Sequence, residues 1–326
     1  MSCNNKFSAK ELTKILDMIL SSVLNLYIMT SFFESTEGFD VLLFDNYGVI
    51  TFGHGISKAV LRQMERLKEM GKTIIILSNS SASSAASENK YAKKGLLKGV
   101  HYDKILTSGE YASEVVRRGK LPVQGKKMFV FGTANFGRPE DKLPDMFKGT
   151  DYTVVDNLDD ADFIYCGVPQ INGEDRIVLE DFIPKIAKCL KSGLPMVCAN
   201  PDYRANEGGR FVVRAGLICK VYNQLGGNTV IFGKPGSGMY NVALRGLDIP
   251  KEKALMVGDT LRTDILGAQR AGIKSCLVIE GGMTEYTLKE RGREVTMANV
   301  VGLAYQDEGI VPDYICERVS DEEPLF

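Results

Sequence analysis

The chain has 326 residues, of which 44% are hydrophobic and 25% are charged, and its 40 basic and 41 acidic residues give a formal net charge of −1. This length suggests about two domains, and the composition is that of an ordinary globular protein. Because the charge is balanced, nothing in it indicates a nucleic-acid or membrane-surface partner.

Cysteine and histidine usage narrows the chemistry further. The 7 cysteines are odd in number and scattered, with no CxxC pair, which predicts reduced thiols in a cytoplasmic protein and neither a disulfide framework nor a zinc site. The chain has only 2 histidines, His54 and His101. Histidine-based triads and histidine-based metal clusters therefore have almost no raw material.

Residues 1–36 are predicted to form an N-terminal helical extension. Ser8 and Glu11 fit a capping box, and apolar residues follow at helical spacing. The uncharged run from Met18 to Phe33 is shorter than the roughly 20 residues that a membrane span needs, and it contains polar residues. We expect a helix packed on the core and no membrane anchor. Self-association into a homodimer and a simple covering role both stay open for it.

The run of apolar residues at 41–44 leads directly into an aspartate, Asp45. Such a run is typical of a strand buried on both faces of a parallel sheet. Asp45 would then lie at the carboxyl end of the strand, where open α/β sheets place their ligand sites, and Gly48 would let the backbone turn sharply. Asp45 is a candidate nucleophile or metal ligand, with an ordinary helix N-cap as the alternative.

The next elements predict a doubly wound parallel sheet. A helix over about 57–70, with Gly71 after it, precedes a strand at 73–77 that ends on Ser78 and Asn79. This β-α-β order implies parallel strands. Ser78 is therefore expected at the same sheet edge as Asp45.

From residue 121 the strand and helix pattern starts again. We interpret 121–212 as an inserted α/β cap domain within a core made of 37–120 and 213–326. A helix over 213–224 is expected to return the chain to the core. The cap is predicted to contain strands at 128–131, 152–155, 163–166 and 196–199, a helix at 178–191, and a turn at Gly208 and Gly209.

The last third of the chain adds more charged residues beside predicted strands. A strand at 229–232 precedes Lys234, and a strand at 254–258 precedes Asp259, with Asp264 near the start of the next helix. Further elements are a helix at 239–246, a helix that ends at Ala271, a strand at 274–279, an edge strand at 313–316 and a frayed acidic tail at 320–323.

The residues at these predicted strand ends have complementary chemistry. Clustered carboxylates repel one another unless a cation lies between them, and hard oxygen ligands suit Mg²⁺. A lysine and a serine hydroxyl suit the oxygens of a phosphoryl group, and an aspartate nucleophile can accept that group as an acyl phosphate.

This constellation resembles the haloacid dehalogenase superfamily. Its four motifs match Asp45 to Ile50, Leu77 to Asn79, Gly233 to Pro235, and Gly258 to Ile265, in the right order. The long insertion between the second and third motifs is similar to the large C2-type (IIA) cap of the sugar-phosphate, phosphoglycolate, pyridoxal-phosphate and nitrophenyl phosphatases. The segment Asn200-Pro201-Asp202 also looks like the exit of that cap.

The resemblance implies a role for each matching residue. Asp45 would be the nucleophile and an Mg²⁺ ligand, Ser78 would hydrogen-bond the phosphoryl group, and Lys234 would neutralise charge. The metal site would be Asp45, the backbone carbonyl of Tyr47, Asp259 and Asp264, the last as a ligand or just behind the ligands. Substrate contacts are expected from Ser78, Asn79, Lys234, Asn200, Asp202 and Arg204, although Arg204 would equally suit a solvated surface turn.

Tyr47 departs from the family pattern, because the family's phosphatases carry a second aspartate there that protonates the leaving group and activates water. A phenol, with a pKa of about 10, is a poor general base at neutral pH, and general acid–base help is worth about 10²–10⁴-fold. We therefore expect slow or restricted turnover, which Tyr47→Asp should raise. Tyr47 as a weak acid, or His54 as a substitute, stays open.

The sequence thus predicts an Mg²⁺-dependent phosphatase of a small phosphorylated metabolite. The alternative is a binding or scaffold protein that keeps the pocket and has lost most turnover. A phosphotransferase that passes the group to an acceptor other than water is a third candidate.

Overall fold

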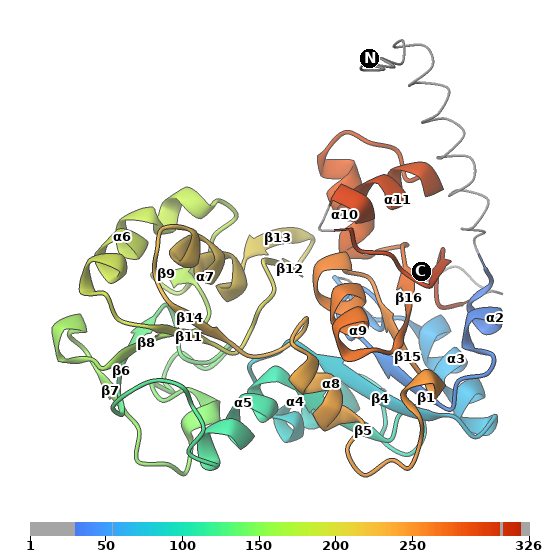
Figure 1. Cartoon of the computed structure of the whole chain (residues 1–326), viewed down its shortest axis with the longest axis horizontal. Coiled ribbons are helices and arrows are strands. Elements are labelled where there is room, and N and C mark those ends of the chain that lie inside the picture. Colours follow the sequence, from blue (N-terminus) through green and yellow to red (C-terminus); the bar gives the residue numbers. More distant parts are fainter. Residues whose placement is uncertain (1–29, 54, 307–308, 321–326) are drawn as a thin grey trace, which may run out of the picture.

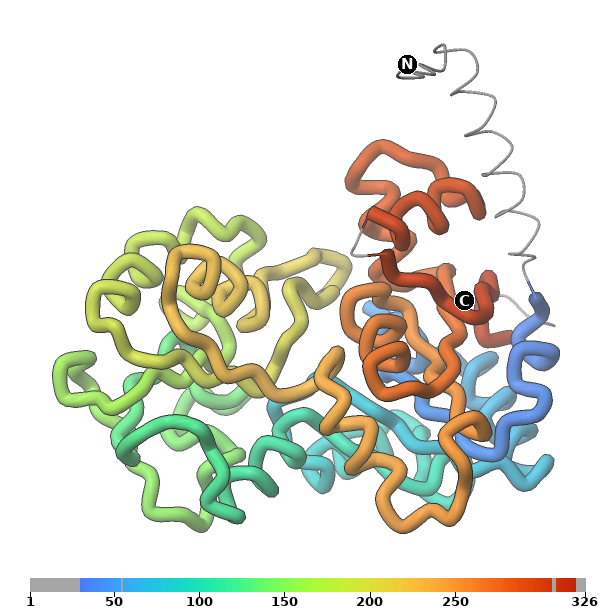
Figure 2. Tube along the Cα trace, viewed as in Figure 1, coloured from blue at the N-terminus to red at the C-terminus, as the bar shows by residue number. Residues whose placement is uncertain are grey.

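The computed structural model describes residues 30–53, 55–306 and 309–320. The predicted helix at residues 8–23, the end of the acidic tail and His54 lie outside the described residues. The described chain forms two lobes, each built on its own parallel sheet (Figure 1). Figure 2 shows that both ends of the chain, in blue and in orange to red, build the first lobe, whereas the green and yellow middle builds the second.

The sheet of the first lobe has the strand order β17-β16-β15-β1-β4-β5, and every neighbouring pair is parallel. Strand β1 is central, and all four of its residues are buried, as the apolar run predicted. The doubly wound fold expected from the sequence is confirmed. The strands are β1 (Val41–Phe44), β4 (Thr73–Ser78), β5 (Lys104–Thr107), β15 (Ala254–Gly258), β16 (Lys274–Val278) and β17 (Tyr314–Cys316).

Alternate residues of β1 pack into different layers. Leu42 and Phe44 join the layer under α2, α3 and α4, whereas Val41 and Leu43 join the layer under α8 and α9. This alternation follows from the two-residue period of a strand and explains why β1 has no polar face. The helices of the lobe are α2 (Phe32–Thr36), α3 (Lys58–Glu69), α4 (Ser84–Ala92), α8 (Ser237–Ala243), α9 (Leu266–Ala271), α10 (Met283–Glu290) and α11 (Met297–Gln306).

The turns of the first lobe follow local chemistry. Helix α3 begins after Ser57, whose side chain accepts a hydrogen bond from the N–H of Val60, and the chain leaves it through Gly71, with a φ of 80°. Short elements complete the lobe: the hairpin β2 (Thr51–Phe52) and β3 (Gly55–Ile56), the 3₁₀ turn η4 (Lys251–Lys253) and the π-helical turn η5 (Leu261–Ile265).

The second lobe has the parallel strand order β14-β11-β8-β6-β7. Helices α6 and α7 cover one face, and α5 with the turn η1 covers the other. Its elements are α5 (Ser108–Arg117), β6 (Lys127–Phe131), η1 (Asp145–Phe147), β7 (Thr153–Val155), η2 (Leu158–Asp160), β8 (Phe163–Cys166), β9 (Gln170–Ile171), β10 (Glu174–Asp175), η3 (Leu179–Phe182), α6 (Ile183–Ser192), β11 (Met196–Cys198), α7 (Ala215–Gln224) and β14 (Thr229–Ile231).

Three details of the second lobe differ from the sequence predictions. We expected residues 108–120 in the core, but Ala112 and Val116 of α5 pack on the second sheet. We expected residues 213–232 in the core, but β14 pairs with β11 and α7 packs on the second sheet. The chain therefore returns to the first lobe at Gly233. The prediction was wrong because both sheets are parallel, and the apolar pattern of a strand does not reveal which sheet it joins. The predicted helix at 178–191 begins with the 3₁₀ turn η3, and the α-helical part starts at Ile183 with Pro184 in its first turn.

A hairpin of the second lobe reaches across to the first (Figure 1). It consists of β12 (Arg204–Glu207) and β13 (Arg210–Val213), joined at Gly208 and Gly209 in the predicted turn. The ring of Phe211 stacks on Tyr286 of α10 with centroids 3.5 Å apart. Within the described residues, no helix is both long and apolar enough to cross a membrane.

Candidate active site

The carboxylate of Asp45 lies where the central strand of the first lobe ends. Its backbone N–H donates to the carbonyl of Val257 at 2.8 Å, which extends the pairing of β1 with β15 by one residue. Asp259 follows β15 directly. The two aspartates are therefore held side by side by the register of adjacent parallel strands.

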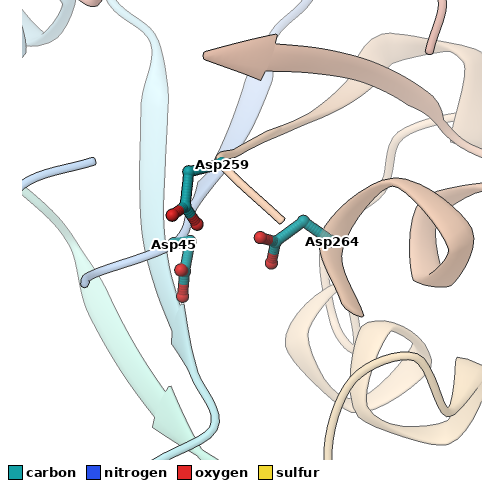
Figure 3. Close-up of side chains that lie close together, drawn as sticks. All are labelled: Asp45, Asp259 and Asp264. Carbon is teal, nitrogen blue, oxygen red and sulfur yellow. The ribbon is translucent and has the colours of Figure 1, made fainter. Parts of the chain in front are cut away.

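Asp45, Asp259 and Asp264 converge on one point (Figure 3). Each contributes a carboxylate oxygen, and these oxygens all lie within 4.8 Å of one another. Burial, followed by the charges of Asp45 and Asp264, raises the pKa of Asp259 well above its usual range. Burial and then the charge of Asp45 raise the pKa of Asp264 to about 7. Crowded oxygen donors that repel one another are a fitting site for a hard divalent cation.

Asp259 is oriented by backbone and hydroxyl donors. Its Oδ2 accepts from the N–H of Met283 at 2.6 Å, and its Oδ1 accepts from the hydroxyl of Thr260 at 3.0 Å. Gly48 passes close above it with a φ of 86°, and a Cβ atom at that position would overlap Asp259 Oδ2. Glycine is thus required at position 48 both for the turn after Asp45 and for the space beside Asp259.

Lys234 connects the nucleophile candidate to Asp264. Its Nζ lies 2.5 Å from Asp45 Oδ1, 2.7 Å from Asp264 Oδ1 and 2.8 Å from the carbonyl oxygen of Leu77. Burial alone would lower the pKa of this ammonium, but the charges of Asp264 and Asp45 outweigh it and raise the pKa. Lys234 therefore stays charged at neutral pH.

The origin of Lys234 is a correction to the sequence analysis. We expected it beside a strand of the same sheet as Asp45, but the preceding strand, β14, belongs to the second lobe. Lys234 reaches the site on the connection that returns from the second lobe to α8. The motif identified the residue correctly as a neighbour of Asp45, while the sheet that carries it could not be read from local pattern.

Ser78 is the last residue of β4 and lines the same cleft as Asp45. Its side chain is buried, and its Oγ accepts a hydrogen bond from the N–H of Ser80 at 3.3 Å. Because β4 is paired with β1, Ser78 lies at the sheet edge that carries Asp45. Its contact with a phosphoryl group stays a prediction.

Asn79 and Asp202 bind each other across the two lobes. Asn79 Nδ2 donates to Asp202 Oδ1 at 2.7 Å, and Asn79 Oδ1 accepts from the backbone N–H of Lys234 at 2.8 Å. Burial raises the pKa of Asp202 to about 6, against the opposing hydrogen bond from Asn79. These groups hold the lobes and Lys234 in place, and their predicted contact with substrate is untested.

Two other predicted substrate residues are engaged with the backbone. Asn200 Oδ1 accepts from the N–H of Asp202 at 3.0 Å, which is a local turn. Arg204 donates from Nη1 to the carbonyl oxygens of Ile177 at 3.0 Å and Phe211 at 3.4 Å. Both residues line the cleft, but in this structure their side chains form hydrogen bonds to backbone groups of the second lobe.

The side chain of Tyr47 lies in the cleft and meets a residue that the sequence analysis missed. Lys90, on α4, donates from Nζ to Tyr47 Oη at 3.0 Å. Nothing in the sequence distinguishes Lys90 from Lys93 and Lys94, the exposed lysines that follow α4. Only the packing of α4 beside the 45–51 turn brings this ammonium to Tyr47.

The cleft between the lobes has a volume of about 1070 Å³. Its floor carries Asp45, Asp259, Ser78 and Lys234, with Asp264 fully buried beside them, and its roof comes from the second lobe, including the β12–β13 hairpin. The floor of the covered cleft thus carries a cation site, a charged lysine and a carboxylate nucleophile candidate. These features define a hydrolase with an α/β core and a cap, acting on an anionic group.

Comparison with known proteins gives the same class. Two family models match the chain: "Haloacid dehalogenase-like hydrolase" over residues 42–141 and "HAD-hyrolase-like" over residues 231–302. These ranges contain all four of the aspartate, serine and lysine motifs described above. The chain belongs to the haloacid dehalogenase-like hydrolases.

Characterised relatives extend over most of the chain. The 4-nitrophenylphosphatase of Schizosaccharomyces pombe is 27% identical over 302 residues, which cover 88% of this chain and 94% of the relative. The ribonucleotide monophosphatase NagD of Escherichia coli is 27% identical over 246 residues, which cover 74% of this chain and 84% of the relative.

Solved structures share the fold. A haloacid dehalogenase-like hydrolase of Brucella suis matches with a TM-score of 0.72 and 24% identity, covering 89% of this chain and 99% of that one. A glycerol phosphate phosphatase of Mycobacterium tuberculosis, in complex with magnesium, matches with a TM-score of 0.59 and 20% identity, covering 90% of this chain and 78% of that one.

Proposed function

We propose that the protein is an Mg²⁺-dependent phosphatase that hydrolyses small phosphomonoesters through an aspartyl-phosphate on Asp45. The contact that carries this proposal is the one between Lys234 Nζ and Asp45 Oδ1, 2.5 Å apart, beside the buried carboxylates of Asp259 and Asp264. The similar proteins of fission yeast and Escherichia coli are likewise a 4-nitrophenylphosphatase and a ribonucleotide monophosphatase.

The proposed mechanism gives each residue one task. The Asp45 carboxylate attacks phosphorus, and the Lys234 ammonium balances the charge of the nucleophile and of the phosphoryl oxygens. Ser78 donates its hydroxyl to one of those oxygens. Water then hydrolyses the acyl phosphate and restores Asp45.

Asp45, the carbonyl of Tyr47 and Asp259 would hold the cation. Bound Mg²⁺ would supply charge neutralisation at the phosphoryl oxygens. Asp264 has both oxygens engaged, one by Lys234 Nζ at 2.7 Å and one by the N–H of Thr260 at 3.1 Å. We therefore assign Asp264 to positioning Lys234. We favour Mg²⁺ over Ca²⁺, although a calcium complex of the mycobacterial relative also exists, because few protein carboxylates and several waters suit the smaller ion.

The second lobe restricts the substrate to small phosphorylated metabolites in this proposal. Residues 108–232 roof the cleft, and the stack of Phe211 on Tyr286 closes it on one side. A roof of this kind excludes bulk water from the reacting group. Macromolecular phosphoesters would need the lobes to separate.

The test uses 4-nitrophenyl phosphate as the probe. Asp45→Asn should abolish hydrolysis that wild type supports with Mg²⁺, and a chelator should abolish it reversibly. Asp40→Asn is the matched control, because Asp40 is exposed at the other end of the same strand. Activity that survives in Asp45→Asn would refute the proposed nucleophile.

The second candidate is a binding protein with little turnover, and Tyr47 is the observation that favours it. Such a protein would bind Mg²⁺ and orthovanadate in calorimetry yet hydrolyse no ester in a screen of phosphorylated metabolites. Under this candidate Tyr47→Asp alone should create measurable turnover.

A further inference from the structure

Tyr47 and Lys90 form a hydrogen-bonded pair inside the cleft that contains Asp45. Lys90 Nζ donates to Tyr47 Oη at 3.0 Å and lies 5.7 Å from the centre of the Tyr47 ring. Both residues line the cleft with Asp45, Ser78 and Lys234. Within the described residues, no carboxylate lies at ion-pair distance from Lys90, so the phenol oxygen is its near polar partner.

A buried hydrogen bond between the chain neighbours of Tyr47 and Lys90 holds these two residues together. Asn46 precedes Tyr47, Tyr91 follows Lys90, and Asn46 Nδ2 donates to Tyr91 Oη at 2.7 Å. The hydroxyl of Thr51 donates to Asn46 Oδ1 at 3.0 Å, and the N–H of Thr51 donates to the carbonyl of Asn46 at 2.7 Å. The turn after the nucleophile and helix α4 are thus locked together in the register that brings Lys90 to Tyr47.

We propose that Tyr47 and Lys90 act together as the proton donor to the leaving group, in place of a carboxylic acid; this rests on the phosphatase function proposed above. The Lys90 ammonium donates a hydrogen bond to the oxygen of Tyr47. The phenolic O–H of Tyr47 therefore stays available to donate to another acceptor. The ammonium also stabilises the phenolate that forms as that proton leaves.

The proton steps balance over the two halves of the reaction. When Asp45 attacks phosphorus, the ester P–O bond breaks and the leaving oxygen keeps its electron pair and takes the proton of Tyr47. Tyr47 takes a proton from Lys90, which becomes a neutral amine. When water attacks the acyl phosphate, its proton passes through Tyr47 back to Lys90, and the P–O bond to Asp45 breaks, which restores the carboxylate. One alcohol and one inorganic phosphate are released per water consumed.

The test compares two substrates whose leaving groups differ in their need for a proton. Nitrophenolate leaves without one, whereas the alkoxide of glycerol 3-phosphate does not. In Tyr47→Phe and in Lys90→Met, kcat/KM for glycerol 3-phosphate should fall about tenfold or more beyond any fall for 4-nitrophenyl phosphate. The double variant should lose no more than the more damaged single variant, because two residues of one relay are not additive.

Lys93→Met is the matched control, since Lys93 is an exposed lysine at the end of the same helix. A thermal melt of each variant checks the fold. Equal losses on both substrates, or additive losses in the double variant, would overturn the relay and leave the phosphatase proposal intact. A wild-type protein that hydrolyses neither substrate with Mg²⁺ would overturn both.

Discussion

Lys234 Nζ lies 2.7 Å from Asp264 Oδ1, and both side chains are buried. The same ammonium touches Asp45, so one cation faces two carboxylates within the protein interior. Such a pair is stable only while both partners are present, because an unpaired buried charge loses its hydration without compensation. Lys234 is therefore a structural element as well as the proposed charge-balancing residue.

Removal of the Lys234 ammonium should damage stability and activity together. We expect Lys234→Met to lower the free energy of unfolding by about 3 kcal/mol at about pH 8, because the carboxylates of Asp45 and Asp264 lose their buried counter-charge. The loss should be smaller at about pH 5.5, because the pKa of Asp264, about 7 with the lysine present, rises further without it and the carboxyl is neutral there. Urea unfolding at the two pH values in the presence of a chelator measures this. An equal loss at both pH values would contradict it.

The acidic cluster predicts how stability depends on pH without metal. The pKa of Asp264 is raised from 3.8 to about 7 in the folded protein, so the folded state binds this proton more tightly than the unfolded state. The resulting stabilisation is complete below about pH 4 and is lost as the pH rises through 7. The stabilisation by bound metal depends on pH in the opposite direction and grows as the pH rises, because the cation needs the deprotonated carboxylates.

Millimolar Mg²⁺ should therefore raise the melting temperature more at about pH 8 than at about pH 5.5. Differential scanning fluorimetry with and without Mg²⁺ measures the two shifts. Asp259→Asn should reduce the shift at the higher pH. A shift that is the same at both pH values would mean that these carboxylates do not bind the ion.

Gly48→Ala should abolish activity by displacing Asp259. The added methyl group would overlap Asp259 Oδ2, and the φ of 86° adds backbone strain of about 1–2 kcal/mol. Gly38→Ala is the matched control, since Gly38 has a φ of 79° and an added Cβ there meets nothing within 4 Å. Both variants should lose similar backbone stability, but only Gly48→Ala should lose Mg²⁺ binding and turnover. Full activity in Gly48→Ala would argue against the placement of Asp259.

Phe211→Ala should weaken closure of the cleft. The stack on Tyr286 is the aromatic contact between the hairpin and α10, and such pairs contribute about 0.5–1.5 kcal/mol beyond burial. We expect KM for small esters to rise several-fold with little change in melting temperature. Steady-state kinetics of Phe211→Ala beside Arg210→Ala, an exposed neighbour in the same hairpin, measures it. Equal kinetics in the two variants would exclude a closing role for the stack.

The sequence by itself determined the central strand, the parallel fold and the acidic, hydroxyl and ammonium groups of the site. These features are local. A four-residue apolar run is typical of a strand covered on both faces, and the structure confirms this strand with Asp45 directly after it. Short motifs around Ser78, Lys234 and Asp259 are likewise contiguous in the chain, so their spacing carries the information.

The tertiary structure alone decided which sheet each later strand joins and which side chains meet across the lobes. We predicted β14 for the core, but it pairs with β11. The prediction was wrong because the sequence of a parallel strand does not indicate which strand it pairs with. The bonds from Asn79 to Asp202 and from Lys90 to Tyr47 join residues far apart in sequence or on separate elements. Such contacts depend on how helices and sheets pack as bodies, and no local pattern of residues encodes that.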